Sequence, residues 1–214
     1  MSNKYDLHIH SMYSKDSNIK PETIVKIAKK VGLNGIAITD HDSIKGGVMA
    51  SKKNKDKNFE VVIGSEIRTK QAEVLGYYLQ EDIKSDDIFE VLDKIKEQGG
   101  VSIISHPFAL LRTRLKCPVK YIENKVNGLE CFNGKATFSF ENRKAHDAAR
   151  EYNLAMTGGS DAHSGFEIGR AFTVFNGRLS SAIIARKTKA EGSTRYSELG
   201  KFISLGHRIS KLFQ

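Results

Sequence analysis

Histidine and carboxylate side chains occur at the ends of short apolar runs throughout this sequence. Five of its seven histidines lie at or just after the C-terminal end of such a run, and four carboxylates lie in similar places. These residues are His8, His10, His41, His106 and His163, together with Asp16, Asp40, Glu66 and Asp161. Imidazole nitrogens and carboxylate oxygens suit Zn, Mn or Fe, so the pattern predicts a metal site without selecting among these ions.

Each of these motifs also has an ordinary structural explanation. His8 and His10 point to the same side of a strand and can reach one cation, but such pairs also occur by chance. His41 lies between two carboxylates that could orient a ligating imidazole or only form a polar turn. Glu66 follows a Val-Val-Ile-Gly-Ser run, where a carboxylate is costly unless it meets a cation. Their joint occurrence at several strand ends favours the metal site.

Strand-like and helix-like segments alternate along the chain until about residue 175. Strands are expected at residues 4–10, 35–40, 61–68, 72–79, 101–105, 128–132, 155–158 and 171–175, and helices at residues 20–31, 44–53, 85–97, 118–124 and 139–152. We expect residues 72–79 to pair with residues 61–68 as a hairpin. The alternation favours a parallel α/β architecture. In a barrel of this kind the C-terminal strand ends converge, which would bring distant residues together.

The basic charge of the chain is concentrated near its C-terminus. Of a net charge of +9, residues 178–214 contribute about +6, from eight Lys or Arg and two Glu. We therefore divide the 214 residues into a barrel, residues 1–176, and a basic, partly helical extension, residues 177–214. A solvated or poorly ordered tail explains this charge, and attraction of an anionic substrate is the alternative. The spacing of the extension's apolar residues favours a helix: Phe202, Ile203, Leu205, Ile209, Leu212 and Phe213.

The remaining composition indicates a cytoplasmic protein with no membrane partner. No run of 18 or more apolar residues is present, and the polar N-terminus lacks the apolar core of a secretory signal. Cys117 and Cys131 stand in unrelated contexts, which argues against a disulfide framework. His146 and His207 match no motif, and we expect both to be surface or packing residues.

Five ordered motifs resemble those of the polymerase and histidinol phosphatase (PHP) family of metal-dependent phosphoesterases. They are Asp6-Leu7-His8-Ile9-His10-Ser11 with Ser14 and Asp16, Ile38-Thr39-Asp40-His41-Asp42, Gly64-Ser65-Glu66, Ser105-His106-Pro107, and Gly159-Ser160-Asp161-Ala162-His163. The resemblance covers roughly residues 4–175. It implies a distorted (β/α)7 TIM-like barrel of the PHP type with a site for up to three metal ions.

The resemblance also implies which residues hold each ion. The first position would use His8, His10, Glu66 and Asp161. Glu66 would bridge to a second position, which His106 also binds, and the third would use Asp16, His41 and His163. Many family members supply a further histidine to the second position, and here the matching place is Asn133, a weaker neutral ligand. Two or three divalent Zn, Mn or Fe ions are therefore expected.

The resemblance implies hydrolysis of a phosphomonoester or phosphodiester, such as a nucleotide or short oligonucleotide. Two ions about 3.5–4 Å apart can hold a bridging hydroxide that attacks phosphorus. Glu66 and Asp161 would support this step, and Arg170, which follows Gly169, would contact the phosphate. A histidinol-phosphate-type phosphatase, a non-catalytic PHP scaffold that binds nucleic acid, and a hydrolase of C–N bonds are alternatives. The substrate and the oligomeric state are not determined by these patterns.

Overall fold

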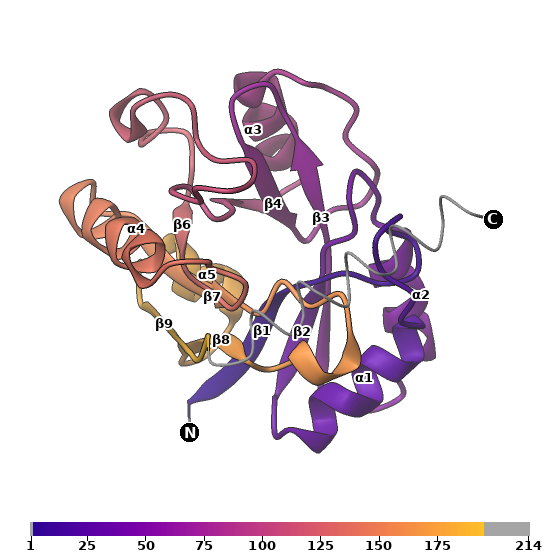
Figure 1. The fold of residues 1–214 in the computed structure, drawn as a ribbon. Helices are drawn as coiled ribbons and strands as arrows, with labels where there is room; N and C mark the ends of the chain where they lie inside the picture. Colours follow the sequence, from indigo (N-terminus) through magenta and orange to yellow (C-terminus); the bar gives the residue numbers. More distant parts are fainter. Residues whose placement is uncertain (1, 195–214) are drawn as a thin grey trace, which may run out of the picture.

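The fold is an α/β barrel in which one long sheet curls around a packed interior (Figure 1). The computed structural model describes residues 2–194. In that range the sheet has nine strands in the order β7-β6-β5-β4-β3-β2-β1-β8-β9. The strands are β1 (Asn3–Ile9), β2 (Gly35–Ile38), β3 (Glu60–Arg68), β4 (Glu73–Tyr77), β5 (Val101–Ile104), β6 (Gly128–Asn133), β7 (Ala155–Gly159), β8 (Ala171–Phe175) and β9 (Thr188–Gly192).

The expected distorted barrel is confirmed, although nine strands replace the expected seven. Strands β1, β2 and β3 pair in parallel, as do β5, β6 and β7. Between these groups β3 and β4 form the expected antiparallel hairpin, and β4 pairs antiparallel with β5. Strand β8 pairs antiparallel with both β1 and β9. Strands β1–β8 fall in the eight segments where the sequence predicts strands, and only β9 was not expected.

Contacts between the two ends of the sheet nearly close the barrel. The hydroxyl of Thr173 on β8 accepts from the Gly158 amide of β7 at 2.9 Å and donates to the Gly158 carbonyl at 3.0 Å. Beyond β7, the Ala162 amide donates to the His8 carbonyl at 3.3 Å. The buried carboxylate of Asp6 accepts the Ser160 amide at 2.8 Å. The strand that carries the first histidines is thus joined to the loop that follows β7.

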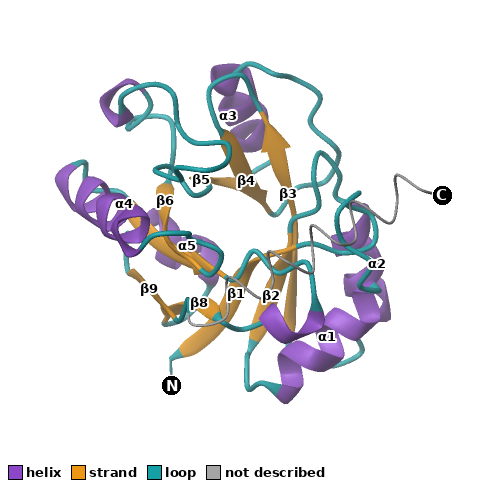
Figure 2. Cartoon of the chain, in the orientation of Figure 1, coloured by secondary structure: helices purple, strands orange, loops and turns teal. Residues whose placement is uncertain are grey.

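Most of the helices lie on the outside of the sheet (Figure 2), whereas the last one packs against the apolar cluster of the barrel interior. They are α1 (Pro21–Lys30), α2 (Lys45–Lys53), α3 (Ile88–Glu97), α4 (Ser139–Glu151) and α5 (Leu179–Ile184), with single 3-10 turns η1 (Val119–Tyr121) and η2 (Gly165–Glu167). Pro21 begins α1, where its missing N–H costs nothing. Asp87 caps α3 by accepting the amides of Phe89 and Glu90. The helix expected at residues 118–124 is only the turn η1.

Apolar side chains from opposite strands fill the barrel beneath the polar strand ends. Leu7, Leu75 and Tyr77 belong to this buried cluster, and the Tyr77 hydroxyl donates to the Leu7 carbonyl at 3.0 Å. A second cluster packs α1 against β1 and β2, and a third packs α3 against β4 and β5. The packed interior gives the polar strand ends a rigid support.

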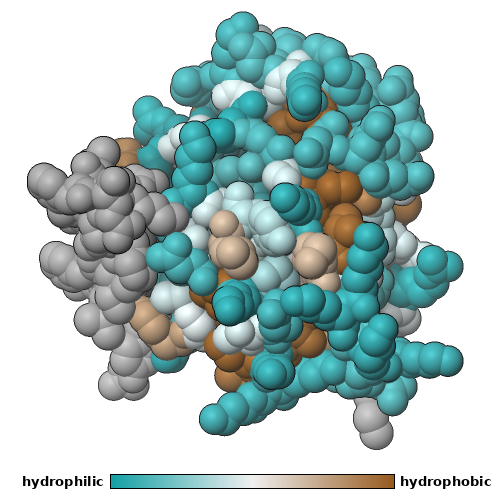
Figure 3. Space-filling model, turned by 90° about the vertical axis from the view of Figure 1, so that its right-hand side faces the viewer, coloured by the Kyte–Doolittle hydropathy of each residue, from teal (hydrophilic) through white to brown (hydrophobic). Residues whose placement is uncertain are grey.

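Part of the expected C-terminal extension belongs to the sheet. Helix α5 buries Leu179, Ala182 and Ile183, and β9 pairs along β8. The helix expected around Phe202–Phe213 and His207 lie outside the described residues, so the division at residue 176 stays a prediction. No helix within residues 2–194 has the length and apolar character needed to span a membrane. The face of the molecule shown in Figure 3 is mostly hydrophilic, with separate small apolar areas.

Candidate metal centre

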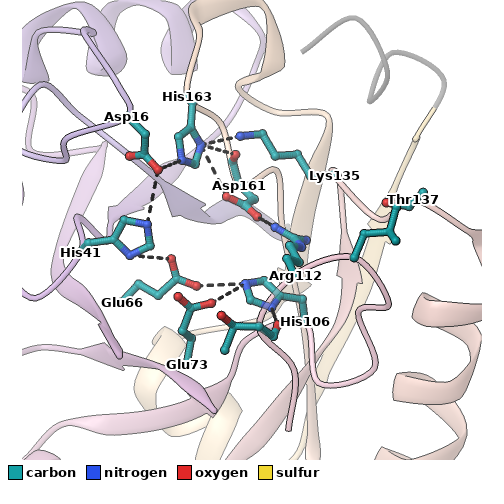
Figure 4. Close-up of a pocket in the computed structure, with 12 residues that line it drawn as sticks. Asp16, His41, Glu66, Glu73, His106, Arg112, Lys135, Thr137, Asp161 and His163 are labelled. Carbon is teal, nitrogen blue, oxygen red and sulfur yellow. Dashed lines mark hydrogen bonds and ion pairs between the residues drawn. The ribbon is translucent and has the colours of Figure 1, made fainter. Parts of the chain in front are cut away.

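A cavity of about 340 Å³ opens at the C-terminal ends of the barrel strands (Figure 4). Histidine and carboxylate side chains form much of its wall, and Arg112, Lys135 and Thr137 form another part. The ligand candidates that line it are Asp16, His41, Glu66, Glu73, His106, Asp161 and His163. His8 and His10 lie beneath them, fully buried. The structure therefore brings together all five predicted histidines.

The first group of ligand atoms comes from β1, β3 and the loop that follows β7. His8 Nε2 lies 3.1 Å from His10 Nε2, and each lies 3.3 Å from Glu66 Oε2. Asp161 Oδ1 is 3.7 Å from His8 Nε2 and 3.5 Å from His10 Nε2. The two imidazoles leave strand β1 on the same side, as the i, i+2 spacing predicts. These four side chains are the predicted first position.

The second group contains the side chains predicted for the third ion. Asp16 Oδ2 lies 3.1 Å from His163 Nε2 and 3.6 Å from His41 Nε2. His10, Asp16, His41 and His163 each offer one ligand atom, and these atoms all lie within 4.8 Å of one another. His41 Nδ1 also lies 3.3 Å from Glu66 Oε2. The first and second groups therefore share His10 and are adjacent.

A third group consists of His41, Glu66 and Glu73, with His106 beside it, and it includes a residue that was not predicted. His106 Nε2 lies 3.1 Å from Glu66 Oε1 and 3.5 Å from Glu73 Oε2. Glu73 also groups with His41 and Glu66 as a possible ligand set. The hairpin register could have revealed it, because Glu73 pairs with Arg68, which points to the same side of β3 as Glu66.

Asn133 lies at the end of β6, but its amide is occupied by protein partners. Its Nδ2 donates to Glu130 Oε2 at 2.9 Å and to Asp161 Oδ2 at 3.2 Å. Its Oδ1 accepts from Arg112 Nη2 at 2.7 Å. Asn133 belongs to none of the ligand groups found among the described residues, so its role as a metal ligand stays a prediction.

Glu130 orients two of the histidines and was also missed. Its Oε1 lies 2.9 Å from His8 Nδ1, and its Oε2 accepts the His106 amide at 2.9 Å. Because a carboxylate only accepts, His8 keeps a proton on Nδ1, which leaves Nε2 as the nitrogen that a metal ion would bind once its own proton is displaced. The signal was a carboxylate inside the apolar run of β6, where burial demands a partner.

Cationic side chains complete the cavity. Arg112 Nη1 pairs with Asp161 Oδ2, and Lys135 Nζ contacts His163 Nδ1. Arg170 lies elsewhere: its Nε donates to the Phe166 carbonyl at 3.2 Å, and it does not line the cavity. Its predicted contact with phosphate stays a prediction. Arg112 follows His106 in a loop without regular structure, so no strand pattern marked it.

The electrostatics of the centre follow from burial and from these contacts. Burial lowers the pKa of His8, but neighbouring carboxylates, Glu66 foremost, raise it well above its ordinary value. Burial raises the pKa values of Glu66 and Asp161, yet the neighbouring positive groups hold both well below the ordinary range. Burial and nearby cationic groups lower the pKa of His163 to about 4. The centre thus combines ionised carboxylates with a neutral His163 that can bind a cation.

The backbone is strained at two ligand positions. His106 has φ 28° and Asp161 has φ 55°, in the left-handed region that non-glycine residues rarely adopt. Gly159 solves a related problem two residues before Asp161, because a side chain there would collide with His8. These backbone conformations turn the two ligands toward the cavity.

The donor set fits divalent metal ions. His8 and His10 place two buried Nε2 atoms 3.1 Å apart among carboxylates, a crowding that a shared cation would relieve. His41 Nδ1 is buried and makes no hydrogen bond in the described part of the chain. Nitrogen and carboxylate oxygen ligands of this kind suit Zn, Mn or Fe. Divalent metal binding is thus the chemistry that this arrangement supports.

Comparisons with known proteins agree with this geometry. The PHP domain family matches residues 6–163, and the PHP-associated family matches residues 140–188. The uncharacterised protein MJ1587 of Methanocaldococcus jannaschii is 43% identical over 141 residues, covering 61% of this chain and 81% of its own length. The uncharacterised protein MJ0417 of the same organism is 34% identical over 179 residues, covering 81% of this chain and 70% of its own length.

Two solved structures share the fold at low identity. A two-domain protein of Bacteroides vulgatus, described as containing a predicted PHP-like metal-dependent phosphoesterase, matches with a TM-score of 0.76 and 22% identity, covering 90% of this chain and 65% of its own. The second is an endonuclease Q in complex with a 27-mer duplex substrate that has an abasic lesion at the active site. It matches with a TM-score of 0.66 and 20% identity, covering 91% of this chain and 61% of its own. This chain spans less than two thirds of either. By fold, by ordered motifs and by sequence, the chain belongs to the PHP domain family.

Proposed function

We propose that this protein hydrolyses a phosphomonoester or phosphodiester in the cavity at the strand ends. One observation carries the proposal: three adjacent groups of metal-ligating side chains share a cavity with Arg112 and Lys135. Ligand groups bind cations, and an arginine with a lysine beside them suits the oxygens of a phosphate. A site for an apolar or cationic substrate would not need this combination.

Bound divalent ions would polarise the phosphoryl oxygens and lower the pKa of a water molecule at the site. The residues of the chain have complementary roles. Arg112 would bind phosphate oxygens with its planar guanidinium, and Lys135 would add a second positive charge. In the described structure these cations pair with Asp161 and His163, so the phosphate would take the place of protein partners. No serine or cysteine lines the cavity in the described region, which favours water over a covalent nucleophile.

The similarity to endonuclease Q, whose structure contains DNA, supports a nucleic acid among the candidate substrates. A phosphorylated small molecule or a nucleotide would use the same metal and phosphate contacts. A purely structural PHP module would have no need of three adjacent ligand groups with their supporting carboxylate. Catalysis is therefore the function that the site supports best.

Hydrolysis of p-nitrophenyl phosphate and bis-p-nitrophenyl phosphate tests this proposal. The protein is stripped of metal and then assayed with Mn²⁺, Zn²⁺ or Fe²⁺ added singly. We expect metal-dependent release of nitrophenol, and loss of that activity in Glu66→Gln. The matched control is Asp93→Asn, which removes a half-exposed carboxylate that pairs with Lys125 and belongs to none of the ligand groups. Equal activity in Glu66→Gln and wild type, or no activity with any of these metals, would contradict the proposal.

A further inference from the structure

A second groove, of about 400 Å³, lies on the outer side of the loop that carries Arg112. The loop follows β5 and lies between α3 and α4 in Figure 1. Side chains of this loop and of α4 line the groove: Phe108, Leu110, Arg114, Lys116, Phe140 and Lys144. The function proposed above does not use this groove.

The groove and the metal cavity are two sides of the same loop. His106 faces the cavity, and the next residue, Pro107, lines the groove. Arg112 lines the cavity, whereas Arg114 lines the groove. Two residues of extended chain span at most about 7 Å, so the two arginines begin close together. Their side chains line different cavities, so a ligand held by Arg112 would reach Arg114 by passing around the loop.

Internal contacts hold this loop in place. The Leu115 amide donates to the Pro107 carbonyl at 3.1 Å, which closes the loop at its base. The buried carboxylate of Glu141 accepts the Leu110 amide at 2.9 Å and the Thr137 amide at 2.8 Å, which ties the loop to the start of α4. The groove is thus a formed surface between two connected elements.

The lining of the groove is cationic and aromatic. Arg114, Lys116 and Lys144 supply three positive charges, and none of the residues that line it is a carboxylate. The Lys144 ammonium lies 5.3 Å from the centroid of the Phe140 ring. Phe138 is not part of the lining but stacks on the Phe140 ring that is, with centroids 5.5 Å apart and planes at 10°, and it is 42% exposed. Positive charge beside exposed, parallel rings suits a ligand with alternating phosphates and flat bases.

We propose that this groove binds the next nucleotide of a single-stranded oligonucleotide whose reacting phosphate occupies the metal cavity. The inference rests on the proposed function and specifies its substrate class. Arg114, Lys116 and Lys144 contact the backbone phosphate, and Phe138 stacks on the base. Stacking on a side chain requires an unpaired base, so a duplex does not fit this role. An isolated phosphate would contact the basic side chains of the groove but would leave the phenylalanine rings without a base to stack on.

Binding of a length series of oligonucleotides tests the inference. The full chain is held metal-free with chelator to prevent cleavage, and fluorescence anisotropy reports binding of one- to six-nucleotide strands labelled at the distal end. We expect affinity to rise between one and three nucleotides. Phe138→Ala should weaken trinucleotide binding about ten-fold and leave mononucleotide binding unchanged. Lys144→Ala should reduce the slope of log K against log salt by about 0.7.

The matched control is Arg150→Ala, which removes one positive charge at the other end of the same helix. It should leave both the affinity and the salt slope near wild type. A length-independent affinity, equal effects of Arg150→Ala and Lys144→Ala, or equally tight binding of duplex DNA would each overturn the inference.

Hydrolysis of bis-p-nitrophenyl phosphate separates this inference from the proposed function. That substrate fills the metal cavity without reaching the groove, so Phe138→Ala and Lys144→Ala should hydrolyse it at the wild-type rate. Wild-type activity on this substrate with no dependence of binding on oligonucleotide length would overturn the groove alone. Length-dependent binding without any hydrolysis would overturn the proposed catalysis and leave the groove.

Discussion

Glu130 connects the β6 strand to the metal centre, and its substitution by glutamine has a definite expected result. Its Oε1 accepts from His8 Nδ1 at 2.9 Å, and its Oε2 accepts from the His106 amide and from Asn133 Nδ2, both at 2.9 Å. Glutamine has nearly the same shape but replaces one accepting oxygen with a donating NH2. The side chain is 1% exposed, so bulk water does not repair the mismatch.

In the Glu130→Gln variant the introduced amide would direct its NH2 toward His8, because that orientation disrupts one hydrogen bond and the opposite one disrupts two. His8 Nδ1 would then have to accept, which moves the imidazole proton to Nε2. A protonated Nε2, 3.3 Å from Glu66 Oε2, no longer offers a lone pair to a metal ion. We expect Glu130→Gln to weaken metal binding about 10- to 100-fold. The loss of stability should be only about 1–3 kcal/mol.

Chelator-competition titrations of the metal-free protein with Mn²⁺ and Zn²⁺ measure the first effect, and urea unfolding in chelator measures the second. Glu141→Gln is the matched control, because Glu141 is also buried but accepts two backbone amides and no histidine. It should lower stability without changing metal affinity. Wild-type metal affinity in Glu130→Gln, or equal losses of affinity in the two variants, would refute the tautomer mechanism.

Three further predictions concern the cavity. With metal in excess, Glu66→Gln should lower turnover more than His106→Ala. One oxygen of Glu66 faces His10 and the other faces His106, so its loss would affect two metal positions. The reverse order in steady-state assays would reject the bridging role of Glu66. Arg112→Lys should lower kcat/KM for phosphorylated substrates about ten-fold, and a wild-type value would remove Arg112 from the phosphate site. Burial lowers the pKa of His41, but Asp16 and Glu66 raise it to about 9. A metal ion must then displace a proton, so calorimetry should show affinity rising with pH up to about 9, and a flat profile from pH 7 to 9 would contradict this.

The predicted ligand candidates converge because strand geometry determines where they point. His8 and His10 share one side of β1 through the two-residue repeat, and each apolar run before Glu66, His106 and Asp161 is a buried strand. The barrel then brings the strand ends together. Periodicity and topology were sufficient for this part of the site.

The residues that sequence reasoning missed depend on pairing and loop geometry. Glu73 reaches His106 because the β3–β4 hairpin adopts a particular register, and Arg112 reaches Asp161 because its loop folds back over the cavity. Neither position has a repeating pattern of its own. The strand count was also too low, because β9 carries several charged and exposed residues and pairs only with β8 among the strands of the sheet. Edge strands of this kind lack the apolar signal of buried ones.

The contact that closes the barrel affects the order of events during synthesis. Asp6 and Ser160 are hydrogen-bonded although they lie 154 positions apart. At roughly 5–20 residues per second, the ribosome needs about 8–30 s to extend the chain from the first of these residues to the second. Throughout that interval the β1 histidines exist without Asp161 and His163. With the ligand set expected here, metal loading would be completed late in the maturation of each molecule, and a chain stalled before β7 would hold only the early candidate ligands.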